Sequence, residues 1–162
     1  LVAFRPILNK MGFDQLNLVI TGGAAAGREL SALWQVWGLN MVEVFGQTEV
    51  GGAMITGQKG PFPQPGDVGI APEGWEVRLG DDGEIMVKSP DMFDGWWREG
   101  GTAQEAVDTD GWLHTGDIGT WENGNLKIVD RARDIIVTTG GKTVSPTYVE
   151  SQPRTFAYTV GP

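Results

Sequence analysis

A strand–turn–helix–strand pattern over residues 16–45 is the feature that most constrains the fold of this chain. We expect a first strand in the apolar run 16–20 and a helix over 28–37, where apolar residues recur at helical spacing. Gly38 should end the helix, and a second strand should cover 41–45. If the two strands are parallel, the turns that follow them lie at the same sheet edge, where α/β proteins bind ligands.

Both turns are suited to a ligand. The first, residues 21–27, reads Thr-Gly-Gly-Ala-Ala-Ala-Gly, and such small residues allow a ligand to approach the backbone closely. The second strand leads into Phe45-Gly46-Gln47-Thr48-Glu49. In that stretch Phe45 can stack on a flat ring, Thr48 suits a phosphate oxygen and Glu49 suits magnesium. Taken alone, the stretch is equally well explained as a solvated exit from a strand.

The sequence pattern of the rest of the chain is typical of a β-rich subdomain. Residues 53–67 are rich in Gly, Pro and Gln and predict an exposed loop. Residues 68–129 predict a small antiparallel, barrel-like subdomain, with hairpin turns at 80–83 and at 122–125, where an Asn-Gly pair occurs. A capping-box sequence predicts one short helix over 102–107. The expected class is therefore α/β, with a piece of an open sheet followed by a barrel-like subdomain.

Composition and charge exclude several classes of function. The formal net charge of -9 argues against a nucleic-acid partner, and the absence of cysteine excludes disulfides and thiolate chemistry. No apolar run approaches the length of a transmembrane segment. The single histidine, His114, is expected to be a hydrogen-bonded structural residue. We expect Trp96, Trp97 and Trp112 to fill the core of the β subdomain, with stacking on a base or sugar as the alternative.

Two further polar stretches contain candidate binding residues. The sequence Thr-Gly-Asp-Ile-Gly over 115–119 places Asp117 between glycines, where it could accept two hydrogen bonds from a vicinal diol or belong to an ordinary β-turn. Residues 129–146 place a charged cluster before a strand that ends in Gly-Gly-Lys. Without further context, this segment is a solvated linker followed by a hairpin.

Together, the three stretches resemble the AMP-forming adenylating enzymes. The carriers of the resemblance are Phe-Gly-Gln-Thr-Glu, Thr-Gly-Asp-Ile-Gly and Asp-Arg-x-x-Asp-x-Ile-Val-x-x-Gly-Gly-Lys-x-Val-x-Pro, in the family's order and at suitable spacing. The third stretch is most similar to that of long-chain fatty-acid–CoA ligases, and the resemblance covers about residues 16–150. It implies a ligase that activates a fatty acid with ATP and Mg²⁺, releasing pyrophosphate, and then transfers the acyl group to coenzyme A, releasing AMP.

The resemblance also implies a role for individual residues. Thr48 would contact the α-phosphate and Glu49 would help to hold magnesium, which makes these two the catalytic candidates. Asp117 would accept hydrogen bonds from both ribose hydroxyls, and Arg131 would reach the ribose or a phosphate. The implied nucleotide-binding set is Gly22, Gly23, Ala24, Phe45, Gly46, Gln47, Thr48, Asp117 and Arg131.

A second group of implied roles concerns the C-terminal domain of the family. Arg133 would be the hinge about which that domain rotates between the two half-reactions. Gly140, Gly141 and Lys142 would lie on the loop that enters the site for thioester formation. Fatty acid, ATP and coenzyme A are the implied small-molecule partners, in a cytoplasmic enzyme for which peripheral membrane association stays open.

The resemblance divides the chain into parts. We expect residues 1–52 to belong to the adenylate-binding sheet domain, 53–130 to the β-rich subdomain and 131–150 to the hinge and start of a C-terminal domain. Residues 151–162 do not resemble the family and are expected to be an aberrant or truncated tail. The family's phosphate loop and late catalytic lysine are not in this sequence, so we expect a piece of a longer enzyme that is inactive alone. The alternatives are an adenylation domain of the peptide-synthetase type and a non-catalytic nucleotide-binding module.

Overall fold

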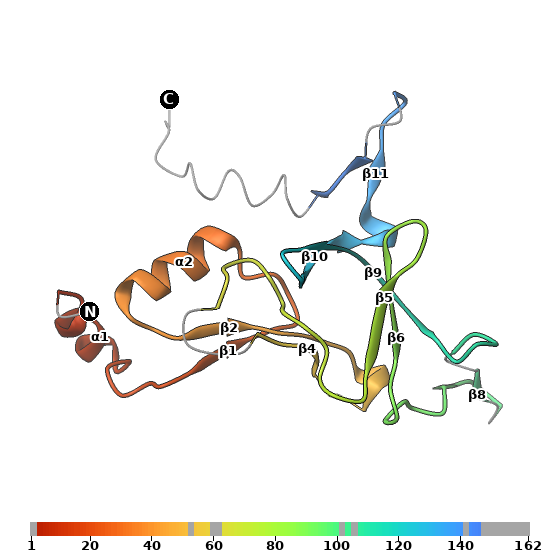
Figure 1. The fold of residues 1–162 in the computed structure, drawn as a ribbon, viewed down its shortest axis with the longest axis horizontal. Helices are drawn as coiled ribbons and strands as arrows, with labels where there is room; N and C mark the ends of the chain where they lie inside the picture. Colours follow the sequence, from red (N-terminus) through yellow and green to blue (C-terminus); the bar gives the residue numbers. More distant parts are fainter. Residues whose placement is uncertain are drawn as a thin grey trace.

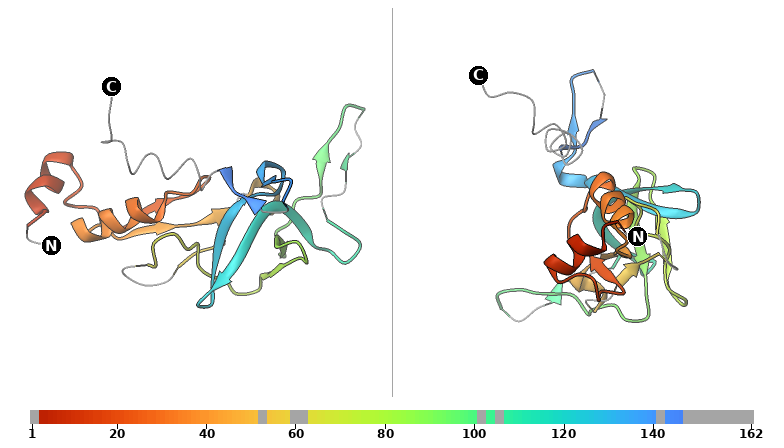
Figure 2. Two further views of the ribbon diagram at one scale, coloured as in Figure 1. Left: turned by 90° about the horizontal axis from the view of Figure 1, so that it is seen from above. Right: turned by 90° about the vertical axis from the view of Figure 1, so that its left-hand side faces the viewer.

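The chain has the α/β architecture expected from its sequence. A computed structural model describes residues 3–51, 54–58, 63–100, 103–104, 107–140 and 143–146. Figure 1 shows helices and short parallel strands on one side, joined to a curled antiparallel sheet on the other. Seen from above, the molecule is elongated, with the two parts end to end (Figure 2).

The N-terminal part contains the predicted strand–turn–helix–strand unit. Its elements are α1 (Arg5–Met11), β1 (Val19–Thr21), α2 (Arg28–Trp37), β2 (Met41–Glu43), β3 (Phe45–Gly46), the 3-10 helix η1 (Thr48–Val50) and β4 (Met54–Thr56). Strands β1 and β2 pair in parallel, with Val19 opposite Met41, so the turns after them lie at one edge of the sheet. Helix α2 has its predicted length and ends at Gly38, whose φ of 101° favours glycine.

Three details of this part differ from the expectation. The first strand begins at Val19 rather than at residue 16, and the second is interrupted at Val44, whose N–H donates to the Thr21 carbonyl at 2.9 Å. The segment 53–67 is not only loop, because β4 pairs with β3 and its residue Ile55 is fully buried in the core. On α2, Ser31 is buried while Leu30 is nearly half exposed, so the predicted apolar stripe is only partly covered.

The antiparallel sheet forms the larger part of the molecule. Its strands are β5 (Glu76–Leu79), β6 (Glu84–Lys88), β9 (Leu113–Glu122) and β10 (Asn125–Arg131), in the order β10-β9-β6-β5. The two predicted hairpins are confirmed, and the second is longer than expected. The sheet curls around a core that includes Ile85, Val87, Leu113 and Leu126, all almost completely buried. Within the described residues it is a half-barrel whose edge strands are β5 and β10.

The expectations for the aromatic segment were wrong. Strands β7 (Trp96–Trp97) and β8 (Ala103–Gln104) pair antiparallel, so residues 103–104 are not helical; residues 102, 105 and 106 of the predicted helix lie outside the described residues. Trp97 is 79% exposed and Trp96 is 41% exposed, so neither fills the core. Trp112 is partly buried beneath the Arg78 guanidinium, which lies 4.1 Å from the ring centroid.

The last described elements leave the sheet. After β10 come the 3-10 helix η2 (Ala132–Asp134) and a hairpin of β11 (Ile136–Val137) and β12 (Thr143–Val144), which projects away from the half-barrel (Figure 1). Gly141, Lys142 and residues 147–162 lie outside the described residues. Within the described parts of the chain, each helix falls short of the length and apolar character that a membrane crossing requires.

Candidate functional site

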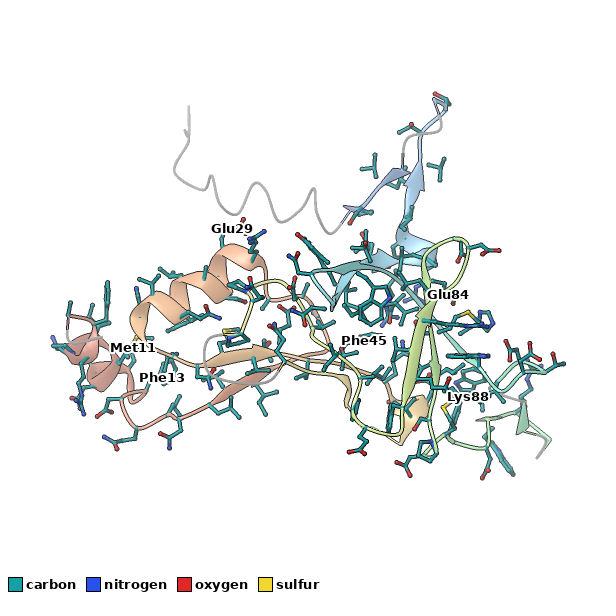
Figure 3. The ribbon with its side chains drawn as sticks, viewed as in Figure 1. Met11, Phe13, Glu29, Phe45, Glu84 and Lys88 are labelled. Carbon is teal, nitrogen blue, oxygen red and sulfur yellow. The ribbon has the colours of Figure 1, made fainter. Side chains whose placement is uncertain are left out.

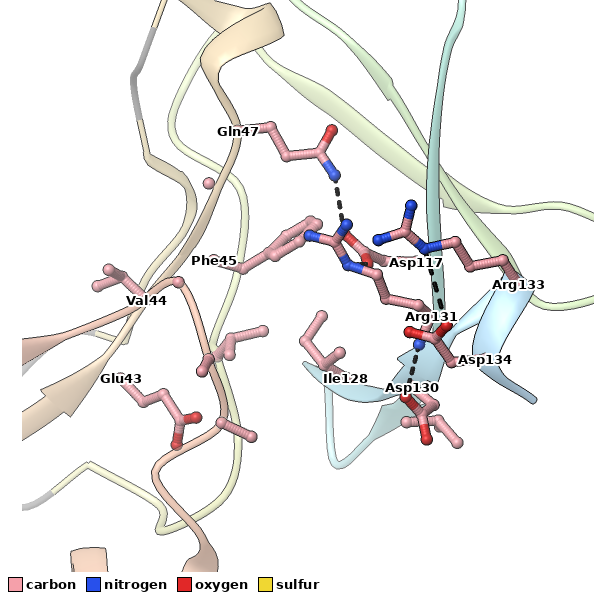
Figure 4. A pocket seen from close by; sticks show the side chains of 16 residues that line it. Glu43, Val44, Phe45, Gln47, Asp117, Ile128, Asp130, Arg131, Arg133 and Asp134 are labelled. Atoms are coloured by element: carbon pink, nitrogen blue, oxygen red, sulfur yellow. Dashed lines mark hydrogen bonds and ion pairs between the residues drawn. The ribbon is translucent and has the colours of Figure 1, made fainter. Parts of the chain in front are cut away.

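A pocket of about 330 Å³ lies where the parallel strands meet the antiparallel sheet (Figure 4). Its lining comes from regions that are distant in the sequence: the turn after β1, the end of β2 with β3, Val68, Asp117 on β9, and the C-terminal half of β10 with the segment that follows it. The lining residues are 23–25, 43–47, Val68, Asp117, 128–131, Arg133 and Asp134. The topology therefore brings the two turns predicted to face a ligand together with residues from both of the later polar stretches, 115–119 and 129–146.

Asp117 is held at the side of this pocket by partners from different elements. Its side chain is 8% exposed. Its Oδ2 accepts a hydrogen bond from Gln47 Nε2 at 2.8 Å, and its Oδ1 lies 3.3 Å from Arg131 Nε. Burial raises the pKa of the Asp117 carboxyl, and the Arg131 guanidinium and the Gln47 amide oppose that rise. The result is a desolvated acceptor whose remaining lone pairs can serve a ligand hydroxyl.

Arg131 faces Asp117 because β10 carries one extra residue. Ile128 is opposite Gly119, but Asp130 is opposite Ile118 and Arg131 is opposite Asp117, so Val129 is the unpaired residue of a β-bulge. In an uninterrupted register Asp130 would stand opposite Asp117, and two carboxylates would repel each other. With the bulge, the Asp130 carboxylate accepts the Arg131 N–H at 2.8 Å and contacts the Ser145 hydroxyl.

Glu43 is a buried carboxylate that the sequence did not single out. It ends β2, is 8% exposed, and its Oε1 accepts the Ala26 N–H at 3.0 Å, which ties the first turn to the second strand. Its Oε2 is buried and has no hydrogen-bond partner within the described part of the chain. Burial raises the pKa of Glu43, the hydrogen bond from Ala26 opposes this, and the nearby Asp67 carboxylate adds to it. A buried oxygen without a hydrogen-bond partner favours a ligand that carries a hydrogen-bond donor at this position.

The small residues of the first turn form one wall of the pocket. Gly23 and Ala24 line it, whereas Gly22 packs beneath, where an added Cβ would lie 3.0 Å from Val44 Cγ2. Phe45 lines the pocket from β3 and belongs to the hydrophobic core, so its ring is held in place. Figure 4 shows Phe45 between Gln47 and Val44 on the side opposite Ile128.

The predicted catalytic pair lies next to the pocket and not in its lining. Thr48 is exposed and Glu49 is partly buried on η1, directly after the pocket residue Gln47. The Glu49 carbonyl accepts the Phe93 N–H at 3.0 Å, which anchors this turn to the loop before β7. Among the described residues, no three His, Cys, Asp or Glu side chains are grouped so as to hold a metal ion. A magnesium ion at Glu49 would therefore need phosphate oxygens, which is how proteins commonly bind it.

The predicted hinge and loop residues are divided between the pocket and the projecting hairpin. Arg133 lines the pocket from η2, and its Nε lies 3.7 Å from Asp134 Oδ1. Gly140 is exposed, does not line the pocket, and belongs to the hairpin of β11 and β12, which projects away from the half-barrel (Figure 1). Gly141 and Lys142 lie outside the described residues.

Comparisons with known proteins point to one group of enzymes. No protein-family model matches the chain. It is 39% identical over 154 residues to the long-chain-fatty-acid–CoA ligase FadD15 of Mycobacterium bovis, covering 94% of this chain and 25% of that protein. Its fold matches ATP-bound MatB of Rhodopseudomonas palustris with a TM-score of 0.74 at 31% identity, covering 90% of this chain and 31% of that one.

A second solved structure adds a bound metal. The o-succinylbenzoate–CoA synthetase MenE of Bacillus subtilis, in complex with ATP and a magnesium ion, matches with a TM-score of 0.72 at 26% identity, covering 94% of this chain and 35% of that one. The chain thus spans about a quarter of the length of the curated relatives it matches. The resemblance to the AMP-forming acyl-CoA synthetases that the motifs indicated is confirmed.

Proposed function

We propose that this chain supplies the AMP-binding face of an AMP-forming ligase that activates a fatty acid, with a long acyl chain, for transfer to coenzyme A. The observation that supports it most is the convergence of Asp117, Arg131 and the turn at 23–25 on one pocket. The relatives named as long-chain-fatty-acid–CoA ligases support the reaction class and the acid. The ATP held by the structural neighbours supports the nucleotide.

The proposed nucleotide contacts follow from the chemistry of the lining. Phe45 offers a ring face and the small residues 23–24 offer open backbone, which together suit a flat base. The unpartnered Oε2 of Glu43 suits the exocyclic amino group of adenine, because a buried acceptor gains most from a matching donor. Asp117 suits the ribose diol, and Arg131 suits the ribose or a phosphate oxygen.

The proposed catalytic contribution is electrostatic alignment. In the first half-reaction a carboxylate oxygen attacks the α-phosphorus of ATP, and the bond to pyrophosphate breaks. Thr48 would donate to an α-phosphate oxygen and Glu49 would hold magnesium, which when bound neutralises developing phosphate charge. In the second, the thiolate of coenzyme A attacks the acyl carbon and AMP leaves with its bonding pair. The pocket residues keep the AMP moiety in one place through both steps.

The remaining assignments complete the proposal. Arg133 serves as the hinge, and Gly140, Gly141 and Lys142 belong to the loop for thioester formation. The proposed division into residues 1–52, 53–130 and 131–150 is supported by the change from parallel strands to half-barrel to projecting hairpin, although β4 (Met54–Thr56) pairs with β3 across the first boundary. The 162-residue chain by itself would bind AMP without forming acyl-CoA. The whole enzyme would act in the cytoplasm, with fatty acid, ATP and coenzyme A as its substrates.

A nucleotide titration followed by NMR tests the proposal. AMP added to the labelled chain should shift amide signals of residues 23–25, 45–47 and 117, and GMP should bind at least about tenfold more weakly, a difference of about 1.4 kcal/mol. Saturable shifts confined to other regions, or no binding by the folded chain at millimolar AMP, would refute the assigned pocket.

A second experiment addresses the acid in a full-length enzyme that contains this sequence. Pyrophosphate exchange should be supported by palmitate and by neither acetate nor amino acids. Exchange that depends on an amino acid would instead favour the peptide-synthetase type of adenylation domain. AMP binding with no exchange for any acid would favour a non-catalytic nucleotide-binding module.

A further inference from the structure

We propose that Glu84 is a positioning residue that holds the bulge of β9 carrying Asp117, and that His114 holds the Glu84 carboxylate in turn. This inference rests on the proposed function, because it concerns how the ribose-binding carboxylate is placed. Glu84 does not line the pocket; it lies at the start of β6 (Figure 3). Its effect on a nucleotide would therefore pass through the backbone of β9.

The first step of the argument is the shape of β9. Met86 is opposite His114 and Glu84 is opposite Ile118, so residues 115–117 of β9 stand opposite Ile85 alone. A segment that bulges in this way loses the regular ladder and leaves backbone groups to be satisfied by side chains. Gly116, at the centre of the bulge, has a φ of 71°, which strongly favours glycine.

Side chains take over the missing ladder bonds. Glu84 Oε1 accepts the Gly116 N–H at 2.9 Å. The Thr115 hydroxyl donates to the Ile85 carbonyl at 2.7 Å and accepts the Asp117 N–H at 3.2 Å. Of these contacts, the one from Glu84 joins the bulge to a neighbouring strand through a charged acceptor, so it should be the strongest.

The second Glu84 oxygen is occupied as well. His114 Nδ1 lies 2.7 Å from Glu84 Oε2, and the Glu84 side chain is only 17% exposed. The other imidazole nitrogen, Nε2, lies 3.4 Å from Asp108 Oδ2. The Glu84 carboxylate thus bridges His114 and the Gly116 backbone. Because both of its oxygens have partners, the side chain is held in one position and does not behave as a mobile surface charge.

The charges around His114 give this bridge a pH dependence. Glu84 faces the imidazole from β6 and Asp108 faces it from the segment before β9, while Arg78 and Lys88 on the same sheet lie against Trp112. The hydrogen bond that the Glu84 carboxylate accepts from His114 raises the pKa of His114 above its usual value, against the effect of partial burial. The bridge should be strongest while His114 is protonated and should weaken as the pH rises through that raised pKa.

Substitutions of Glu84 separate this role from a general effect on folding. Glu84→Ala should weaken AMP binding by about tenfold, because the Asp117 bulge is no longer fixed. It should also lower the hydrogen-exchange protection of the Gly116 amide and return the pKa of His114 toward its usual value. Glu84→Gln keeps an acceptor for Gly116, so AMP affinity should stay within about twofold of the wild type while the His114 pKa still falls. The exposed Glu76 on β5 provides the matched control, and Glu76→Ala should change none of these readouts.

The readouts distinguish failure of this inference from failure of the proposed function. The chain contains one histidine, so its imidazole titration can be followed directly by NMR without a nucleotide. Unchanged Gly116 protection and unchanged AMP affinity in Glu84→Ala would overturn the inference. If the wild-type chain binds no AMP, the proposed function fails, while the Gly116 protection and the His114 titration still decide the role of Glu84. If Glu84→Ala does not fold, His114→Gln decides, because His114 is half exposed: wild-type Gly116 protection at all pH values in that variant would overturn the inference.

Discussion

Replacing Asp117 by asparagine should weaken nucleotide binding while leaving the unliganded fold almost unchanged. The substitution keeps the shape of a side chain that is 8% exposed and removes its charge. An asparagine Oδ1 can still accept the hydrogen bond that Gln47 Nε2 now donates at 2.8 Å. The partner that loses most is Arg131, whose side chain is 53% exposed and can turn to water.

The expected change in stability is small because two effects oppose each other. Burial raises the pKa of Asp117, so ionising this carboxyl costs more free energy in the folded chain than in the unfolded chain. Asparagine carries no charge and removes that cost at neutral pH. The lost pairing with the half-exposed Arg131 is worth roughly 0 to 1 kcal/mol. The free energy of unfolding at neutral pH should therefore change by no more than about 1 kcal/mol.

The expected loss of affinity is larger. A hydrogen bond to a charged group contributes about 1.5–3 kcal/mol, which corresponds to roughly 10- to 150-fold in the dissociation constant for AMP. Titration calorimetry with AMP and thermal unfolding would measure the two effects on the same preparations. Asp81→Asn, at an exposed turn of the β5–β6 hairpin, is the matched control and should change neither.

The pH dependence gives a further check on the same variant. Because the folded-state pKa of Asp117 is raised, the wild type should gain stability relative to Asp117→Asn as the pH falls through that pKa toward the unfolded value. A variant that binds AMP as tightly as the wild type would remove Asp117 from the site. A variant destabilised by several kcal/mol at neutral pH would show that the carboxylate is mainly structural.

Three other substitutions test separate parts of the structure. Glu43→Gln should lower the preference for AMP over GMP by about tenfold in competition titrations, because Oε2 would become a donor; an unchanged preference would contradict the role given to that oxygen. Arg131→Lys should weaken AMP binding by roughly 3- to 10-fold without a change in melting temperature, since a lysine lacks the guanidinium fork and the side chain is half exposed. Gly119→Val should destabilise the fold by about 1–3 kcal/mol in denaturant titrations, because even a Cβ would lie 2.8 Å from Ile85 Cδ1; normal stability would mean that the core there is loosely packed.

The parts of the fold that the sequence predicted well are those with a strong local signal. Helix α2 has its predicted bounds because apolar spacing and Gly38 mark it, and the β9–β10 turn forms at Asn123-Gly124, whose φ values of 52° and 81° suit those residues. Strand β4 was missed because its neighbours are rich in Gly and Pro, although Ile55 is completely buried. Its burial depends on tertiary contacts that no local pattern reports.

The site likewise contains residues with a local sequence signal and residues that only tertiary contacts reveal. The resemblance of the polar stretches to the AMP-forming adenylating enzymes implied that Gln47, Asp117 and Arg131 belong to one site, and all three line one pocket. Glu43 and Glu84 were missed because a single carboxylate in a strand has no distinctive local pattern. Their hydrogen bonds reach Ala26 and Gly116, which lie 17 and 32 residues away in the sequence. Only the completed strand pairing makes these contacts visible.

The unpaired residue Val129 determines how the adjacent acidic and basic side chains of β10 are presented. In a perfectly regular ribbon in place of β9 and β10, Asp130 and not Arg131 would stand opposite Asp117, and a second acid would lie where a base now lies. Engineers who transplant this hairpin into another scaffold would therefore have to copy its irregularity along with its amino acids.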